Sequence, residues 1–99
     1  MNLTGKQKAY LKKLIHGATP AVMIGAKGVS EQVIKTIDDE LNLKELIKIK
    51  FIEFKDEKKE LFAEIAEKVG AYPIDIIGNI GILYRQNSDK EKQKIKIPF

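Results

Sequence analysis

The sequence predicts an α/β fold in which helices pack against a mixed four-stranded sheet. The first observation is that helical and strand-like apolar patterns follow one another in the order α-β-α-β-α-β-β. The second is that strands separated by helices favour right-handed crossovers and parallel pairing, whereas the last two strand patterns stand at hairpin spacing and favour antiparallel pairing. The third is length, because 99 residues suffice for one compact domain.

The first helix is predicted to begin just after Thr4, because Thr4 and Gln7 have the spacing of a capping box. Its apolar side chains recur at helical spacing on one side, and Gly17 is expected to end it. Residues 20–24 then form a short apolar run that predicts a buried strand. This strand leads into a glycine-bounded turn at residues 25–28.

The middle of the chain predicts two further helices with a strand between them. Ser30 is a suitable N-cap for a helix whose apolar stripe extends to Leu41. Residues 46–52 alternate apolar and polar side chains as a half-buried strand does. Asp56 is predicted to cap the third helix, and Gly70 is predicted to end it.

The last part of the chain predicts a β-hairpin. Residues 72–77 and 80–85 have strand patterns, and Gly-Asn at residues 78–79 separates them. The segment that follows is polar and then alternates lysine with isoleucine, a pattern that fits either an edge strand or a tail. We therefore expect one domain over residues 1–86 and a polar tail or edge strand over residues 87–99.

Composition excludes several kinds of site. The chain has no cysteine and one histidine, His16, which excludes disulfides, thiolate metal sites, cysteine nucleophiles and multi-histidine metal sites. The sequence contains no plausible nucleophile–base pair, so we predict no catalysis, metal or cofactor. No apolar run is long enough to span a membrane, and lysines interrupt the stretch where a signal peptide needs its apolar core. These features predict a soluble cytoplasmic protein, which we expect to be a monomer.

Positive charge is concentrated in the first third of the chain. The net charge is +4, but residues 31–99 carry 13 basic and 14 acidic side chains and so contribute −1. A charge distribution of this kind predicts one positive face for an anionic partner, of which nucleic acid is the commonest. A solvated lysine-rich helix explains the same charge equally well. The first 30 residues contain no acid and five lysines: Lys6, Lys8, Lys12, Lys13 and Lys27.

The Gly-x-x-Gly turn at residues 25–28 is the most distinctive local feature. Glycine lets the backbone approach a phosphate closely, and the helix N-terminus near Ser30 offers N–H groups without intrahelical partners. Lys27 adds a positive charge at the tip of the turn. This combination is typical of a loop that holds an RNA backbone. A tight strand-to-helix turn without a ligand has the same glycine spacing, and both interpretations remain open.

Five motifs, in order and at matching spacing, resemble the CRM domain (chloroplast RNA splicing and ribosome maturation), in particular its bacterial single-domain YhbY type. The resemblance covers residues 3–85, nearly the whole chain. The motifs are Leu3-Thr4-Gly5-Lys6-Gln7-Lys8-x-Tyr10-Leu11 with His16, Ile24-Gly25-x-x-Gly28, Glu45-Leu46-Ile47-Lys48-Ile49-Lys50, Asp56-Glu57-Lys58-Lys59-Glu60-Leu61, and Ile77-Gly78-x-x-x-x-Leu83-Tyr84-Arg85.

The resemblance implies a fold similar to the C-terminal domain of a bacterial translation initiation factor. It also implies RNA binding, and association with ribosomal RNA or precursors of the large ribosomal subunit during ribosome assembly. The site residues that it implies come from the first helix, the glycine loop and the last strand: Lys6, Lys8, Lys12, Lys13, Gly25, Ala26, Lys27, Gly28 and Arg85.

Three features depart from the family pattern, and one of them is Tyr72-Pro73, which is less typical at the start of its strand. Many relatives have lysine directly after the first glycine of the loop, whereas this chain has Ala26 there and Lys27 next. The loop therefore stays charged, but its lysine is displaced by one residue. Gly81 stands where relatives usually have an apolar strand residue, and we expect it to weaken the last strand.

Two other functions fit parts of the sequence. A small acylphosphatase-like enzyme would need an arginine in a phosphate-binding loop, but the single arginine, Arg85, lies late in a strand. A protein-interaction adaptor could use the sheet or the alternating C-terminal segment for strand addition. For the RNA-binding interpretation, the sequence shows no obvious platform of several aromatic side chains. We therefore expect recognition of RNA shape more than of base sequence.

Overall fold

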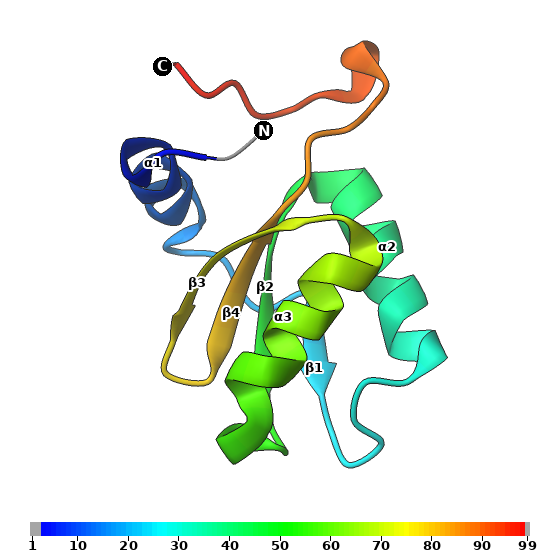
Figure 1. Cartoon of the computed structure of the whole chain (residues 1–99). Helices are drawn as coiled ribbons and strands as arrows, with labels where there is room; N and C mark the ends of the chain where they lie inside the picture. The colour runs from blue at the N-terminus through cyan, green and yellow to red at the C-terminus, as the bar shows by residue number, and fades with distance from the viewer. Residues whose placement is uncertain (1–2, 99) are drawn as a thin grey trace.

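The computed structural model describes residues 3–98, which contain three α-helices and a four-stranded sheet (Figure 1). The predicted order of elements is confirmed. Two short 3₁₀ turns, Lys55–Glu57 and Lys90–Lys92, precede the third helix and follow the last strand. The helices are α1 (Gly5–Ile15), α2 (Glu31–Lys44) and α3 (Lys58–Val69), and the strands are β1 (Val22–Ile24), β2 (Leu46–Phe51), β3 (Tyr72–Ile77) and β4 (Ile80–Tyr84).

The sheet is mixed, as predicted, with the strand order β1-β2-β4-β3. β1 pairs in parallel with β2, while β4 pairs antiparallel with both β2 and β3. The hairpin therefore places its second strand in the centre of the sheet and its first strand at the edge. Because β4 has partners on both sides, its backbone is fixed more firmly than that of either edge strand.

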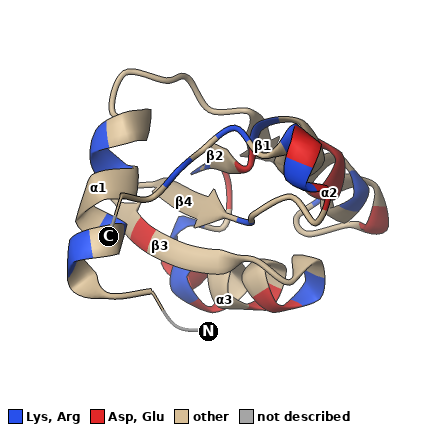
Figure 2. Cartoon of the chain, turned by 90° about the horizontal axis from the view of Figure 1, so that it is seen from above, with Lys and Arg blue, Asp and Glu red and all other residues tan. Residues whose placement is uncertain are grey.

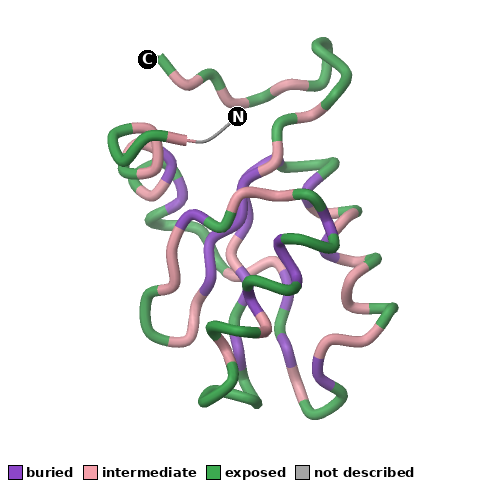
Figure 3. The backbone as a smooth tube through the Cα atoms, in the orientation of Figure 1, coloured by how far each residue is buried: buried purple, intermediate pink, exposed green. Residues whose placement is uncertain are grey.

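The sheet separates two apolar clusters, and Figures 1 and 3 show the layers. α2 and α3 cover one face, where Ile37, Leu41 and Phe62 pack against inward-facing residues of the strands. α1 lies on the other face, which we call the α1 face. The α1-face cluster comprises Leu11, Ile15, Leu46, Ile74, Ile82 and Tyr84, with Ile95 and Ile97 packed against it.

Residues 86–98, which we call the C-terminal strap, pair with no strand of the sheet. Glu45, at the end of α2, is fully buried and holds this segment. Its carboxylate accepts hydrogen bonds from the backbone N–H groups of Asn87 at 2.6 Å, Lys94 at 2.6 Å and Ile95 at 2.9 Å. Three N–H donors satisfy a buried carboxylate that would otherwise be costly to remove from water. These hydrogen bonds therefore hold the strap against the rest of the domain.

β4 pairs on both sides at Gly81, so the glycine does not interrupt the strand, and the expected weakening stays a prediction. The partners of Gly81 are Ile49 on β2 and Ile76 on β3. A Cβ atom added at Gly81 would lie 2.5 Å from the ring of Phe62, which packs on the strand from α3. The glycine thus lets a large aromatic ring approach the centre of the sheet directly.

The start of α3 differs from the prediction. Asp56 does not cap the helix; it lies inside the 3₁₀ turn Lys55–Glu57. Glu57 occupies the N-cap position, and no side-chain hydrogen bond caps the helix there. Phe54, the residue just before the 3₁₀ turn, has a left-handed backbone with φ of 58°. This bend adds a short turn before the helix, and the N-cap moves one residue along the chain.

Candidate nucleic-acid interface

α1 presents the basic surface that the sequence predicts. The capping box at its start is present, because the Thr4 hydroxyl accepts from the N–H of Gln7 and the Gln7 side chain accepts from the N–H of Thr4. Leu11 and Ile15 anchor the helix on the sheet. This anchoring leaves Lys6 and Lys13 exposed and Lys8 and Lys12 half-buried. Figure 2 shows basic and no acidic positions along α1, whereas α2 and α3 carry both signs.

Lys12 differs from the other α1 lysines because it has an acidic partner on the sheet. Its Nζ atom lies 2.8 Å from Oδ2 of Asp75 on β3. The hydrogen bond from Lys12 is the main cause that holds the pKa of Asp75 below its usual value, and burial is the next largest cause and acts in the opposite direction. The charge of Lys12 is thus partly neutralised within the protein.

Lys12→Ala should raise the pKa of Asp75 towards its ordinary value. A carboxyl whose pKa is lowered in the folded state stabilises the fold above its unfolded pKa, and this contribution disappears as pH falls through the folded pKa. Lys12→Ala should therefore reduce the stability that is lost as pH falls through the folded pKa of Asp75. The effect should be small, because the side chains of Lys12 and Asp75 are about 40% exposed. NMR titration of the Asp75 carboxyl carbon measures the change. Lys13→Ala is the control, and an equal shift in both variants would contradict the assignment to Lys12.

Lys48 on β2 also points to the α1 face, but its ammonium group is hydrogen-bonded within the protein. Its Nζ atom donates to the backbone oxygens of His16 at 3.0 Å and Ala18 at 2.9 Å. These carbonyls lie just beyond the last turn of α1, where a cation is favourable. Lys48 therefore fixes the end of α1 to the sheet.

Part of the α1 face of the sheet remains uncovered. Met23 on β1 is in register with Lys50 on β2, Lys50 with Ile80 on β4, and Ile80 with Ile77 on β3. These four residues form one row across the sheet, opposite to the side on which α2 and α3 pack. Met23 and Ile77 are more than half exposed, and Lys50 is exposed. The row places a cation between α1 and the glycine loop, which follows β1.

The glycine loop at residues 25–28 is a tight turn with an exposed tip. Gly28 has φ of 67°, and its N–H donates to the carbonyl of Gly25 at 3.0 Å. The ring of Phe54 covers Gly28 and would lie 3.3 Å from an added Cβ. Ala26 and Lys27 stay exposed at the tip. The second glycine is thus required by backbone conformation and packing, whatever the loop binds.

The N-terminus of α2 beside this loop is already partly satisfied. The hydroxyl of Ser30 accepts from the N–H of Val33 at 3.2 Å, as predicted for an N-cap. Glu31 places a carboxylate in the first turn, which interacts favourably with the helix dipole. A phosphate at the loop would therefore depend on Lys27 more than on the helix end.

Arg85 lies apart from the other residues that the resemblance implies. It follows β4, and its guanidinium joins α2 and α3. One nitrogen donates to the Asp38 carboxylate at 2.6 Å and to the carbonyl of Val69 at 2.8 Å. The other donates to the carbonyl of Asp38 at 3.0 Å and the amide oxygen of Asn42 at 2.9 Å. These four bonds use most of its donors within the fold.

The structure thus brings the α1 lysines together on one face and places the loop at the far end of that face (Figure 1). Sequence reasoning did not single out Lys50 or the apolar row beside it, although the alternation along β2 places Lys48 and Lys50 on one side. The described residues contain no cluster of His, Cys, Asp or Glu that could hold a metal ion. In the same part of the chain, no helix is long and apolar enough to cross a membrane.

Comparisons with known proteins agree with the motif analysis. The model of the CRS1 / YhbY (CRM) domain family matches residues 3–85. An RNA-binding protein of Haemophilus influenzae is 39% identical over 97 residues, covering 97% of this chain and 95% of that protein. "Probable RNA-binding protein YqeI" of Bacillus subtilis is 36% identical over 97 residues, with 97% and 99% covered. The solution structure of SAV1595 from Staphylococcus aureus has a TM-score of 0.78 at 36% identity, covering 96% of this chain and 100% of that one.

Proposed function

Because the chain belongs to the CRS1 / YhbY (CRM) domain family, we propose that it binds RNA through the α1 face. The observation that carries the proposal is α1 itself, which holds four lysines and no acid on the side of the sheet opposite α2 and α3. Lysine contacts to phosphates supply most of the affinity of such surfaces and depend little on base sequence.

The glycine loop extends this surface in the proposal. Lys27 is exposed at its tip, and the turn between Gly25 and Gly28 keeps the backbone close to any group bound there. Lys50 lies between α1 and the loop on the same face. An RNA backbone that follows these cations would run from α1 along β2 to the loop. Arg85 supports this surface indirectly, by fixing β4 to α2 and α3.

The RNA is, in this proposal, ribosomal RNA or a precursor of the large ribosomal subunit, bound during ribosome assembly in the cytoplasm by a monomeric protein without catalytic activity. The family resemblance supports this part, together with relatives whose names describe RNA binding. Crosslinking in the cell, followed by sequencing of the attached RNA, tests it. Enrichment of messenger RNA without ribosomal RNA would contradict it.

Lys13→Ala should weaken the salt dependence of RNA binding. Each phosphate contact contributes about 0.7 to the slope of log affinity against log salt for single-stranded nucleic acid, so losing Lys13 should flatten the slope by about that amount. Lys12→Ala should flatten it less, since Asp75 already pairs with Lys12. Fluorescence anisotropy of a labelled structured RNA at several salt concentrations measures both slopes.

The control for these variants is Lys68→Ala, which removes a lysine from α3 on the other side of the sheet. It should leave the salt slope unchanged. If the two α1 variants behave like this control, α1 is not part of the RNA surface. Binding of a protein partner that ignores salt and survives the lysine substitutions would instead favour an adaptor.

A further inference from the structure

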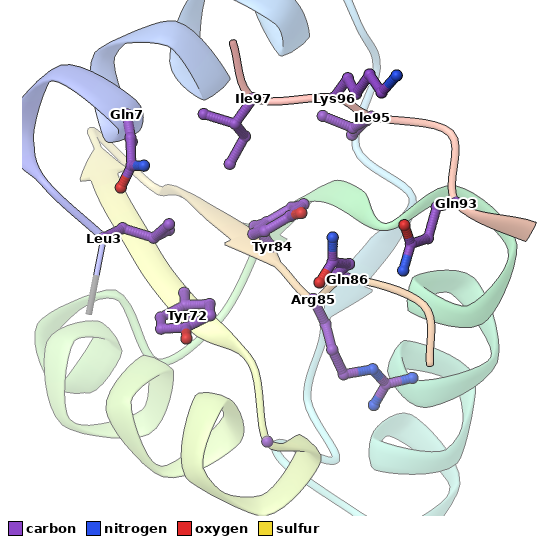
Figure 4. Close-up of a pocket in the computed structure, with 11 residues that line it drawn as sticks. Leu3, Gln7, Tyr72, Tyr84, Arg85, Gln86, Gln93, Ile95, Lys96 and Ile97 are labelled. Carbon is purple, nitrogen blue, oxygen red and sulfur yellow. The ribbon is translucent and has the colours of Figure 1, made fainter. Parts of the chain in front are cut away.

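A cavity of about 560 Å³ lies between the sheet and the C-terminal strap (Figure 4). Tyr72 on β3 and Tyr84 on β4 form its floor, with ring centroids 6.4 Å apart and planes inclined by 20°. Ile95 and Ile97 of the strap face the tyrosines. The volume is typical of sites that enclose small flat molecules. No carboxylate is among the described residues that line it.

Tyr84 is the most informative residue of this cavity. Only 3% of it is exposed, yet no hydrogen bond within the described residues engages its hydroxyl. That oxygen is not sealed inside the protein either, so it opens into the cavity that Tyr84 lines. Burial, with smaller contributions from Glu45 and Tyr72, raises the pKa of Tyr84, so the hydroxyl remains neutral. Because the hydroxyl opens into the cavity, it can donate a hydrogen bond to a polar group of a ligand bound there.

The rim of the cavity offers both hydrogen-bond donors and acceptors. The side-chain amides of Gln7, Gln86 and Gln93 stand around it, from α1 and from the strap (Figure 4). The Gln7 amide oxygen already accepts from the N–H of Thr4, and the Gln93 amide nitrogen already donates to the carbonyl of Asn87. The amide of Gln86 can both donate and accept, as the polar edge of a nucleobase requires. The guanidinium of Arg85 points out of the cavity towards α2, so it does not occupy the space of a ligand there. Lys96 adds a positive charge beside the opening.

The cavity adjoins the basic surface of the proposed function. Gln7 belongs to the first turns of α1, and its chain neighbours are Lys6 and Lys8. A strand of RNA whose phosphates lie on these lysines would have a base within reach of the opening. Tyrosine rings favour stacking with any nucleobase, because each base presents a flat π-face.

We infer that this cavity receives one unstacked nucleobase of the bound RNA, which stacks on the half-buried ring of Tyr72 and hydrogen-bonds to the Tyr84 hydroxyl and the amide of Gln86. The inference rests on the proposed function and adds a base site to a surface that otherwise contacts phosphates. It needs no platform of several aromatic side chains, because Tyr84 is almost fully buried and the stacking surface is the ring of Tyr72.

The test compares two RNA hairpins that differ at one bulged position. One has a bulged adenosine and the other an abasic ribose at that place, so their phosphate charges are equal. The full-length protein should bind the first about tenfold more tightly, within the range that base–aromatic stacking contributes. Tyr84→Phe removes only the hydroxyl and should lose severalfold affinity for the bulged adenosine, with an unchanged salt slope. Thr36→Val, which removes a hydroxyl from α2 on the other side of the sheet, is the control.

The outcomes separate this inference from the proposed function. Equal binding of the two hairpins, with the lysine-dependent salt slope intact, overturns the base site and leaves RNA binding by α1 standing. Failure to bind either hairpin overturns both. If Tyr84→Phe does not fold, the comparison of the two RNAs with the unaltered protein still decides the question. Equal losses in Tyr84→Phe and Thr36→Val would remove Tyr84 from the contact.

Discussion

Gly81→Ala is expected to lower the free energy of unfolding by about 1–3 kcal/mol, the usual cost of overpacking a core. The added Cβ would lie 2.5 Å from the Phe62 ring. Phe62 is buried, so its ring cannot swing into solvent, and β4 is paired on both sides and cannot move away. Urea denaturation followed by far-ultraviolet circular dichroism measures the loss. Gly17→Ala is the control, because an added Cβ there meets nothing within 4 Å.

A second substitution, at Phe62, tests whether the clash with its ring causes the loss of stability in Gly81→Ala. Phe62→Leu removes the aromatic edge that an alanine at position 81 would meet, although it costs stability by itself. In the double variant the two losses should not add, since the clash is no longer present. Additive losses would mean that Gly81 is required by the strand backbone and not by the packing of Phe62.

Lys27→Glu is expected to weaken RNA binding about tenfold at low salt, with little change in stability. The substitution reverses the charge at the exposed tip of the glycine loop, where the proposed RNA backbone passes. A tenfold change corresponds to about 1.4 kcal/mol, a reasonable cost for replacing one attraction by a repulsion. Stability should hold because the tip buries no charge and lies near the positive end of the α2 dipole. RNA affinity at fixed salt and a thermal melt are the measurements.

Lys68→Glu is the matched control for the loop variant. It makes the same change of charge on α3, where it breaks an exposed ion pair with Glu64. Such pairs contribute about 1 kcal/mol or less to stability. If the two variants bind RNA equally well, the loop has no special role and only net charge matters. A loop variant that binds like the unaltered protein would remove Lys27 from the interface.

Local patterns predict most of the fold, because most of its elements are specified by residues close in sequence. The capping box of Thr4 with Gln7 and the N-cap Ser30 are examples, and both are present. Arg85 and Glu45 are different. Their partners lie up to 47 and 50 residues away, so no local pattern indicates them. The resemblance alone assigns Arg85 to the RNA site, and that assignment stays a prediction.

The tyrosine floor was missed for a more specific reason. Ile77 is in register with Ile80, and a regular hairpin would continue from there to place Pro73 opposite Tyr84. The structure has an irregularity between Pro73 and Asp75 that shifts the register by one residue, so Tyr72 lies opposite Tyr84. A β-bulge of this kind leaves no clear mark in the sequence. The two rings therefore come together only once the strands have paired.

The strap, which Glu45 holds in place, has a lower local stability than the sheet. Three hydrogen bonds to the Glu45 carboxylate, one from the Asn87 amide to the carbonyl of Asn42, and the contacts of Ile95 and Ile97 hold residues 86–98. In contrast, β2 and β4 are fixed by full ladders and a packed core. Segments held by few contacts open more often than the whole protein unfolds. Since the strap is one wall of the cavity, its opening would set how quickly a base enters and leaves. Residence time on RNA would then depend on how firmly Glu45 holds the strap, separately from the affinity that the lysines provide.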